Sequence, residues 1–344
     1  EVSVRLHLLL LSVLLAVAWL CVNRGHSAQE PLPPSTPARV GELVPKVTLG
    51  TRLAWQGAGS CAAMACHNAD ALSGFDRREY KIAFERDFSH EIPSVKDKHA
   101  QAYAVLFNDR SQRIIRNLQK SPADKVVHAE REDLCLRCHV HPEYERQPPW
   151  MRADGVSCEA CHGPAERWLA THFRPGFKEL SASARAAQGM FDTRSVPGRV
   201  ALCVDCHIGT QNAEVNHDLI AAGHPWLRFE FADYHARWHK HWEPAKDKNP
   251  AADARAQADF EARAWVVGQV ASAQAALHLL ATRAGDAKRP WPEFVELDCF
   301  ACHHDLQEPR TRTPRGDKTG APTWNSWYYA MASDALTVAG ERAK

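Results

Sequence analysis

The chain has 344 residues, enough for one large domain or two of ordinary size. Lysine and arginine number 42 against 41 aspartate and glutamate, so the formal net charge is only +1, and no basic block stands out. This balance excludes the strongly basic class of nucleic-acid-binding proteins, and we expect no nucleic-acid partner.

Residues 1–28 have the layout of a secretory signal. Arg5 precedes an apolar run from Leu8 to Val22, and small residues follow up to Ala28. The run is short for a comfortable membrane span. We therefore predict export to the periplasm. An uncleaved segment is the alternative, and membrane association is expected only in that case.

Residues 29–48 are rich in proline, which predicts an extended linker between the signal and the rest of the chain. The remaining sequence contains the cysteine pattern that decides the class of protein.

Ten of the eleven cysteines form five pairs, and each pair is followed directly by a histidine. Four pairs are Cys-x-x-Cys-His, and the first is stretched to four intervening residues. The motifs are Cys61/Cys66/His67, Cys135/Cys138/His139, Cys158/Cys161/His162, Cys203/Cys206/His207 and Cys299/Cys302/His303. The eleventh cysteine, Cys21, is an apolar residue of the signal run.

This spacing is the attachment signature of c-type haem. Two thiols add to the two vinyl groups on one edge of a haem, and the adjacent imidazole becomes an axial iron ligand. A longer intervening loop, as in the first motif, still spans both vinyl groups. The sequence predicts five covalently bound haems, with the ten paired cysteines as attachment points and the five motif histidines as proximal ligands.

Two other uses of paired cysteines fit less well. Zinc sites take two pairs per metal, so five pairs leave one over, and they do not require a histidine after every pair. A disulfide framework does not require one either.

Four segments of the chain favour helices. Residues 99–118 are expected to be helical in two pieces, and residues 129–138 form a short helix that carries Cys135 and Cys138. Residues 253–284 are the strongest helix, ended by Gly285 and Pro290. Its expected apolar face is Phe260, Ala264, Val267, Ala271, Gln274, Leu277 and Leu280.

Residues 308–323 are a polar loop, and residues 325–342 are expected to form the last helix. Strand signals are weak throughout. The predicted fold class is a mainly α, loop-rich multihaem cytochrome, with short helices around stacked c-type haems and little β structure.

Three segments resemble the cytochrome c-554 family and larger exported multihaem cytochromes that contain its domain. Residues 155–165 surround the third motif, 97–103 follow the first, and 215–225 lie after the fourth, with His241 and Trp242 further on. The likeness spans roughly 55–245. We therefore divide the chain into a four-haem domain at 49–245 and a C-terminal helical region with the fifth haem at 246–344. The stretched first motif and the fifth haem depart from the small tetrahaem members.

The resemblance implies haems in close stacked and perpendicular pairs, along which an electron hops. It also implies sixth ligands: His172 for the haem of His67, His99 for the haem of His162, and His224 or His217 for the haem of His207. In the resembling proteins the second haem lacks such a ligand, so the iron at His139 is a candidate open site.

Other histidines could complete the remaining sites, because haem iron takes exposed and buried imidazoles alike. His128 and His141 lie near the second motif and could close its iron. His278 and His241 are the candidates for the fifth haem. The full set of distal candidates is His99, His172, His224, His217, His241 and His278.

The leading functional prediction is a periplasmic electron carrier that works between redox partner proteins, because ligation and burial set haem potentials. No catalytic residue is assigned. The alternative is a small-molecule oxidoreductase with nitrogen-oxide type chemistry, in which a small gas or nitrogen oxide binds an open haem at His139.

Overall fold

A computed structural model describes residues 53–62, 67, 97–119, 127–238, 259–304 and 322–342. The expected signal, the linker, Cys66, His241 and nearly all of the expected loop at 308–323 lie outside these residues. Within the described residues the regular secondary structure is helical, apart from two isolated bridges, Thr210 with Ala213 and Leu297 with Trp324, and loops join the helices. The predicted mainly α, loop-rich fold with little β structure is confirmed.

The first helices appear where the sequence predicts them. Residues 99–118 form separate pieces rather than one helix, because Asn108 is extended and caps a new helix by accepting a hydrogen bond from the Ser111 amide. The elements of this part are η2 (Ala58–Ser60), η4 (Lys98–Gln101), η5 (Ala104–Phe107), α2 (Asp109–Leu118), η6 (Ala129–Arg131) and α3 (Asp133–His139).

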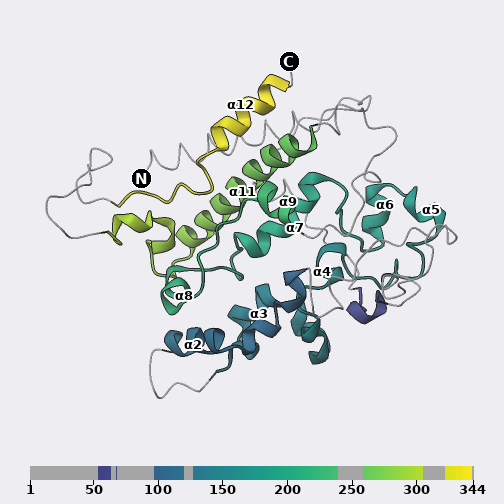
Figure 1. Ribbon diagram of the computed structural model, residues 1–344, viewed down its shortest axis with the longest axis horizontal. Coiled ribbons are helices and arrows are strands. Elements are labelled where there is room, and N and C mark those ends of the chain that lie inside the picture. Colours follow the sequence, from purple (N-terminus) through teal and green to yellow (C-terminus); the bar gives the residue numbers. More distant parts are fainter. Residues whose placement is uncertain are drawn as a thin grey trace.

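The middle of the chain consists of short helices joined by loops (Figure 1). Three of them, α3, α4 and α7, end at the motif histidines His139, His162 and His207. The elements are η7 (Tyr144–Arg146), η8 (Pro149–Asp154), α4 (Cys158–His162), α5 (Pro175–Lys178), α6 (Ala182–Ala187), α7 (Val196–His207), α8 (His217–Ala222) and α9 (Phe231–Arg237).

The long helix α11 (Phe260–Gly285) runs through the C-terminal half and packs against α7, α9 and α12 (Ala332–Arg342) (Figure 1). Ala264 and Val267 of the predicted face are buried against α7 and α9. Val266 and Val270 are buried against α12 on another side. The single predicted face was therefore incomplete, because α7 and α9 cover one side of the helix and α12 covers another.

Gly268 permits the close crossing of α11 and α9. A β-carbon at this position would lie 2.8 Å from the β-carbon of Phe231, nearer than atoms in contact approach. Because α11 packs on α7 and α9, the C-terminal region shares a core with residues 196–237.

Among the described helices, α11 is long and apolar enough by composition to cross a membrane, although half of its apolar window is buried against other elements. Its three helical neighbours identify it as a core helix of this fold. Two small elements follow it, η9 (Phe294–Glu296) and η10 (Cys299–Ala301), of which the second carries the start of the fifth motif. The last helix begins at Ala332 rather than at 325, and Trp324, just before the expected start, pairs with Leu297 in a bridge.

Candidate haem sites

The first pair of candidate ligands is His67 and His172. Their imidazole rings face each other with centroids 6.1 Å apart and planes inclined by 8°. The His172 Nδ1–H donates to the carbonyl of Leu169 at 2.8 Å, which leaves Nε2 available on the side of the ring away from that bond. This is the pair that the resemblance implies.

The separation of these rings fits one metal ion between them. Imidazole nitrogens bind metals at about 2 Å, so two rings on opposite sides of one iron have centroids about 6 Å apart. A backbone carbonyl that accepts from the other ring nitrogen is the usual support for a ligating histidine. The donor chemistry and the spacing both fit an axially ligated haem iron.

The second pair is His99 and His207, with ring centroids 6.1 Å apart and planes at 90°. Asp97 accepts from His99 Nδ1 at 2.9 Å. Burial, with repulsion from His99 in addition, lowers the pKa of His207 to about 4, so its imidazole is neutral at pH 7. Metals bind imidazole in the neutral form. The resemblance implied His99 for the haem of His162, whereas the structure brings it to His207.

The third pair is His217 and His303, with ring centroids 6.3 Å apart and planes at 31°. The sequence offered His217 for the haem of His207, and His278 or His241 for the fifth haem. His278 instead lies on the exposed side of α11, and His241 lies outside the described residues. The ring that faces the fifth motif is therefore His217.

His224 lies near His139, close enough for the two imidazoles to interact electrostatically. Burial is the main cause that lowers the pKa of His224, and the charges of His139 and Arg110 lower it further. Nδ1 of His139 donates to the Ala102 carbonyl at 2.7 Å, and Nδ1 of His224 donates to the Pro225 carbonyl at 2.8 Å. The sequence had assigned His224 to the haem of His207, whose ring faces His99.

The other two histidines near the second motif behave differently. His141 is 1% exposed and stacks on Trp55 at 5.0 Å, and its Nδ1 donates to the Pro142 carbonyl. The facing histidines are all at least partly exposed, as side chains that bind a large cofactor would be. His141 is thus packed as a core residue, and His128 is exposed.

The second, third and fourth motifs meet through their sulfur atoms. The thiols of Cys138 and Cys206 lie within hydrogen-bonding reach of each other. Cys161 is close enough to Cys203 and Cys206 to raise the pKa of both, although burial is the larger cause for Cys203. Haems attached at these sulfurs are therefore neighbours.

The described cysteines are not arranged as a disulfide or zinc protein requires. No disulfide joins the nine cysteines of the described residues, and these residues contain no group of three or more metal-ligating side chains. Pairs of histidines that face each other are the arrangement that haem iron needs, because the porphyrin supplies its other four ligands.

Large apolar side chains stand exposed around the fifth motif. Phe294 is 59% exposed, Phe300 66% and Trp324 50%, and the Phe294 ring packs edge-on against His217. A flat apolar cofactor held between His217 and His303 would cover surface of this kind. The exposed apolar side chains around the fifth motif are therefore also consistent with a bound haem.

The third motif also holds the first in place through Glu159, which the sequence did not single out. This side chain is 1% exposed and accepts hydrogen bonds from the amides of Gln56, Gly57 and Ala165 at 2.7–3.0 Å. Glu159 thereby joins α4 to the segment that leads into Cys61. The sequence around Glu159 gives no signal of this role, because two of the amides that bind its carboxylate lie in a segment far earlier in the chain.

Cysteine pairs that end in histidines, together with facing imidazoles, define the class of c-type cytochromes. Residues 90–163 match the family model described as cytochrome c554 and c-prime. This match supports a c-type cytochrome of the c554 family over the matched segment, and such a family implies c-type haem iron and haem-based electron transfer. The matched segment contains the second and third motifs. No curated protein and no solved structure matches the chain.

Proposed function

We propose that this chain is an exported, periplasmic electron carrier that binds five c-type haems and passes electrons between redox partner proteins. All five motifs have the two cysteines and the histidine that covalent attachment needs. When bound, each haem supplies the one-electron redox chemistry, and the chain sets its axial ligands, its burial and its neighbours.

The observation that carries the proposal is the pairing of histidine rings at 6.1 Å, His67 with His172 and His99 with His207. An iron with two imidazole ligands has no position left for a substrate and is suited to electron exchange. Two such sites favour a carrier over an enzyme.

The contact between Cys138 and Cys206 supports passage of electrons from site to site. These sulfurs belong to the second and fourth motifs, and Cys161 of the third lies beside them. Because cysteines of three motifs lie this close together, the distances over which an electron passes from one haem to the next are expected to be short.

The oxidoreductase alternative requires an open iron at His139. We assign His224 as the sixth ligand there, on the basis of its position beside His139. α2 supports this loop, because Arg110 donates to the Gly223 carbonyl at 2.9 Å and Asn117 donates to the Ala222 carbonyl at 3.0 Å. This assignment leaves no open position for a gas at the His139 haem.

Export is supported by residues 1–28, whose apolar run from Leu8 to Val22 has the layout of a secretory signal. The proline-rich linker lies between this segment and the first haem motif. The periplasm is also where an exported c-type cytochrome meets soluble redox partners.

The test is a pyridine haemochrome count combined with the intact mass of the purified protein. We expect five haems per chain and the loss of the first 28 residues. The matched control, Cys299→Ser with Cys302→Ser, should retain four haems. A colourless protein, or one whose wild-type and control counts are equal, contradicts the proposal.

Carbon monoxide separates the carrier from the enzyme. The haem at His139 should not bind the gas in the reduced carrier, because we assign His224 as its sixth ligand. Binding of the gas at the His139 haem of the wild-type protein would favour the oxidoreductase.

A further inference from the structure

The fifth haem motif is joined to a segment far earlier in the chain by a buried ion-pair cluster. Arg283 of α11 lies between two carboxylates, with Nε 2.6 Å from Glu214 and Nη1 2.5 Å from Glu296. The three side chains are 6%, 10% and 12% exposed. Glu214 precedes α8, and Glu296 closes η9 just before the fifth motif.

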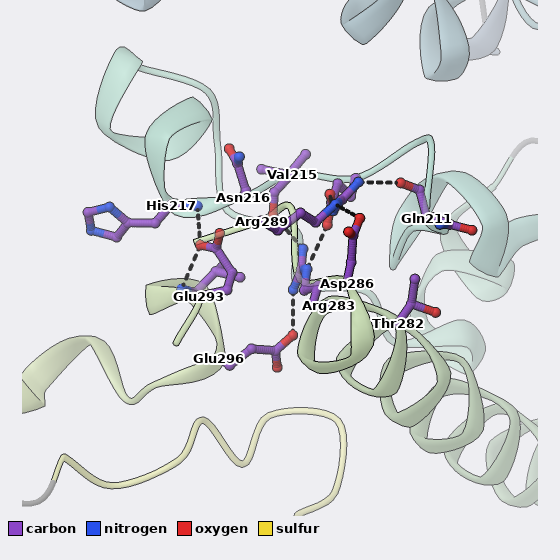
Figure 2. Close-up of polar contacts among 12 residues, drawn as sticks. Gln211, Val215, Asn216, His217, Thr282, Arg283, Asp286, Arg289, Glu293 and Glu296 are labelled. Carbon is purple, nitrogen blue, oxygen red and sulfur yellow. Dashed lines mark hydrogen bonds and ion pairs between the residues drawn. The ribbon is translucent and has the colours of Figure 1, made fainter. Parts of the chain in front are cut away.

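Arg289 reinforces this cluster from the end of α11. It forms an ion pair with Glu214, and its Nη2 donates to the Gln211 carbonyl at 2.8 Å. Asp286 pairs with Arg289 at 3.3 Å. Figure 2 shows both arginines between the 211–217 segment and α11. The segment that leads to His217 is therefore held at several points.

A second contact fixes the start of α8. The carboxylate of Glu293 accepts from the backbone amide of His217 at 3.0 Å and from that of Val295 at 3.3 Å. The Phe294 ring meets the His217 imidazole edge-on at 5.5 Å. In Figure 2 the His217 ring points away from the arginines.

The result of these contacts is the facing pair of His217 and His303, with ring centroids 6.3 Å apart. This separation matches the about 6 Å expected for two imidazoles on one metal ion. We infer that His217 is the distal ligand of the haem attached at Cys299 and Cys302, and that Arg283 is the positioning residue that holds it there.

This inference rests on the proposed function, since it requires a fifth haem. It adds that the fifth site takes one ligand from each side of the expected domain boundary near residue 245. The C-terminal region is then not a separable one-haem unit, because its iron is closed by the four-haem part of the chain.

The decisive variant is His217→Ala in the full-length holoprotein, with His278→Ala on the exposed side of α11 as the matched control. Ferric electron paramagnetic resonance and haemochrome counts are recorded on both. We expect five haems in each, and a high-spin signal that is larger in His217→Ala than in the control by about one fifth of the haem, an excess removed by added imidazole. A fully low-spin His217→Ala protein with five haems overturns the inference.

Two further variants identify the haem that His217 ligates. Where Cys299→Ser and Cys302→Ser have removed the fifth haem, His217→Ala should add no high-spin signal. In His217→Met, the reduction potential of one haem should rise, since methionine ligation raises it, while the other four stay unchanged. A high-spin signal that persists without the fifth haem assigns His217 to another site and overturns the inference.

Arg283 is tested separately from its effect on folding. Arg283→Met strands the carboxylate of Glu296, whereas Glu214 still pairs with Arg289. Arg283→Met with Glu296→Met also removes the stranded carboxylate and can restore stability. If Arg283 positions His217, the high-spin signal of the fifth haem appears in both variants and is reduced in Arg283→Lys. If the double variant is entirely low-spin, Arg283 only stabilises the fold and its positioning role is overturned.

A failure of this inference is distinguishable from a failure of the proposed function. A wild-type count below five haems contradicts the proposed function. A count of five haems, with no added high-spin signal in His217→Ala, contradicts only the assignment of His217.

Discussion

The imidazole of His172 lies opposite that of His67, with ring centroids 6.1 Å apart and planes within 8° of parallel. A hydrogen bond from His172 Nδ1 to the Leu169 carbonyl orients the ring. We predict that His172→Ala converts one haem from low to high spin, because it removes one of two axial ligands. The ferric absorption and paramagnetic resonance spectra measure this change.

The control for this prediction is His128→Ala, which removes an exposed histidine that faces no motif histidine in the described residues. It should leave the spectra unchanged. An unchanged spectrum in His172→Ala, with the full haem count retained, would show that His172 is not a ligand.

A second prediction concerns His224, which lies beside His139. His224→Ala should open the iron at His139, so that the reduced variant binds carbon monoxide at about one fifth more of its haem than the wild-type protein does. Added imidazole should compete with the gas. Carbon monoxide binding by the wild-type protein to the same extent as by the variant contradicts the assignment.

The sequence reveals the attachment chemistry directly, because covalent linkage needs two cysteines and a histidine within one short segment. Local helices were also predictable: α3 and the two-piece segment that ends at Leu118 lie where their apolar periodicity indicates. These features depend on neighbours in sequence, so a single chain is enough to find them.

The distal ligands depend on distant segments, and here the sequence is a weaker guide. His99 meets His207 rather than His162, and His217 meets His303 although it lies far before the fifth motif. Nothing near His217 signals this partner. The contact follows from the packing of α11 on α7 and from Arg283, whose two carboxylate partners come from different segments.

Glu159 gives a third prediction. Its buried carboxylate accepts from three backbone amides, two of them in the segment before Cys61. In Glu159→Gln one carboxylate oxygen, which accepts hydrogen bonds, becomes an NH2 group, which donates them. This new donor then faces backbone amides that are donors themselves. We expect a loss of about 1–3 kcal/mol in the free energy of unfolding, the cost of leaving buried donors unpaired. Denaturant titration measures it.

Glu166→Gln is the matched control, because Glu166 accepts from the Ala54 amide of the same segment at 2.7 Å in an exposed position. Water can replace that bond, so the loss should be within about 0.5 kcal/mol. Equal losses in the two variants would show that burial of Glu159 is unimportant.

The last prediction concerns pH and Tyr144, which is 3% exposed and donates to Asp133 at 2.7 Å. Burial, followed by the hydrogen bond to Asp133 and its negative charge, raises the pKa of Tyr144 well above its ordinary value of 10.0. Asp133 is the first residue of α3, which carries the second motif. Tyr144→Phe should cost about 1 kcal/mol at pH 8, the contribution of one hydrogen bond.

The sign of the pH dependence follows from the raised pKa. Above pH 10 the unfolded chain loses the phenol proton while the folded chain keeps it, so the folded state is progressively disfavoured. The stability that Tyr144 adds is therefore complete below pH 10 and is lost as the pH rises beyond it.

Urea unfolding of the wild-type protein and Tyr144→Phe should show a difference in the free energy of unfolding that shrinks between pH 8 and pH 11. Tyr103→Phe is the comparison for a half-buried phenol. A difference that stays constant over this range would mean that the Tyr144 phenol ionises equally in the folded and unfolded chains.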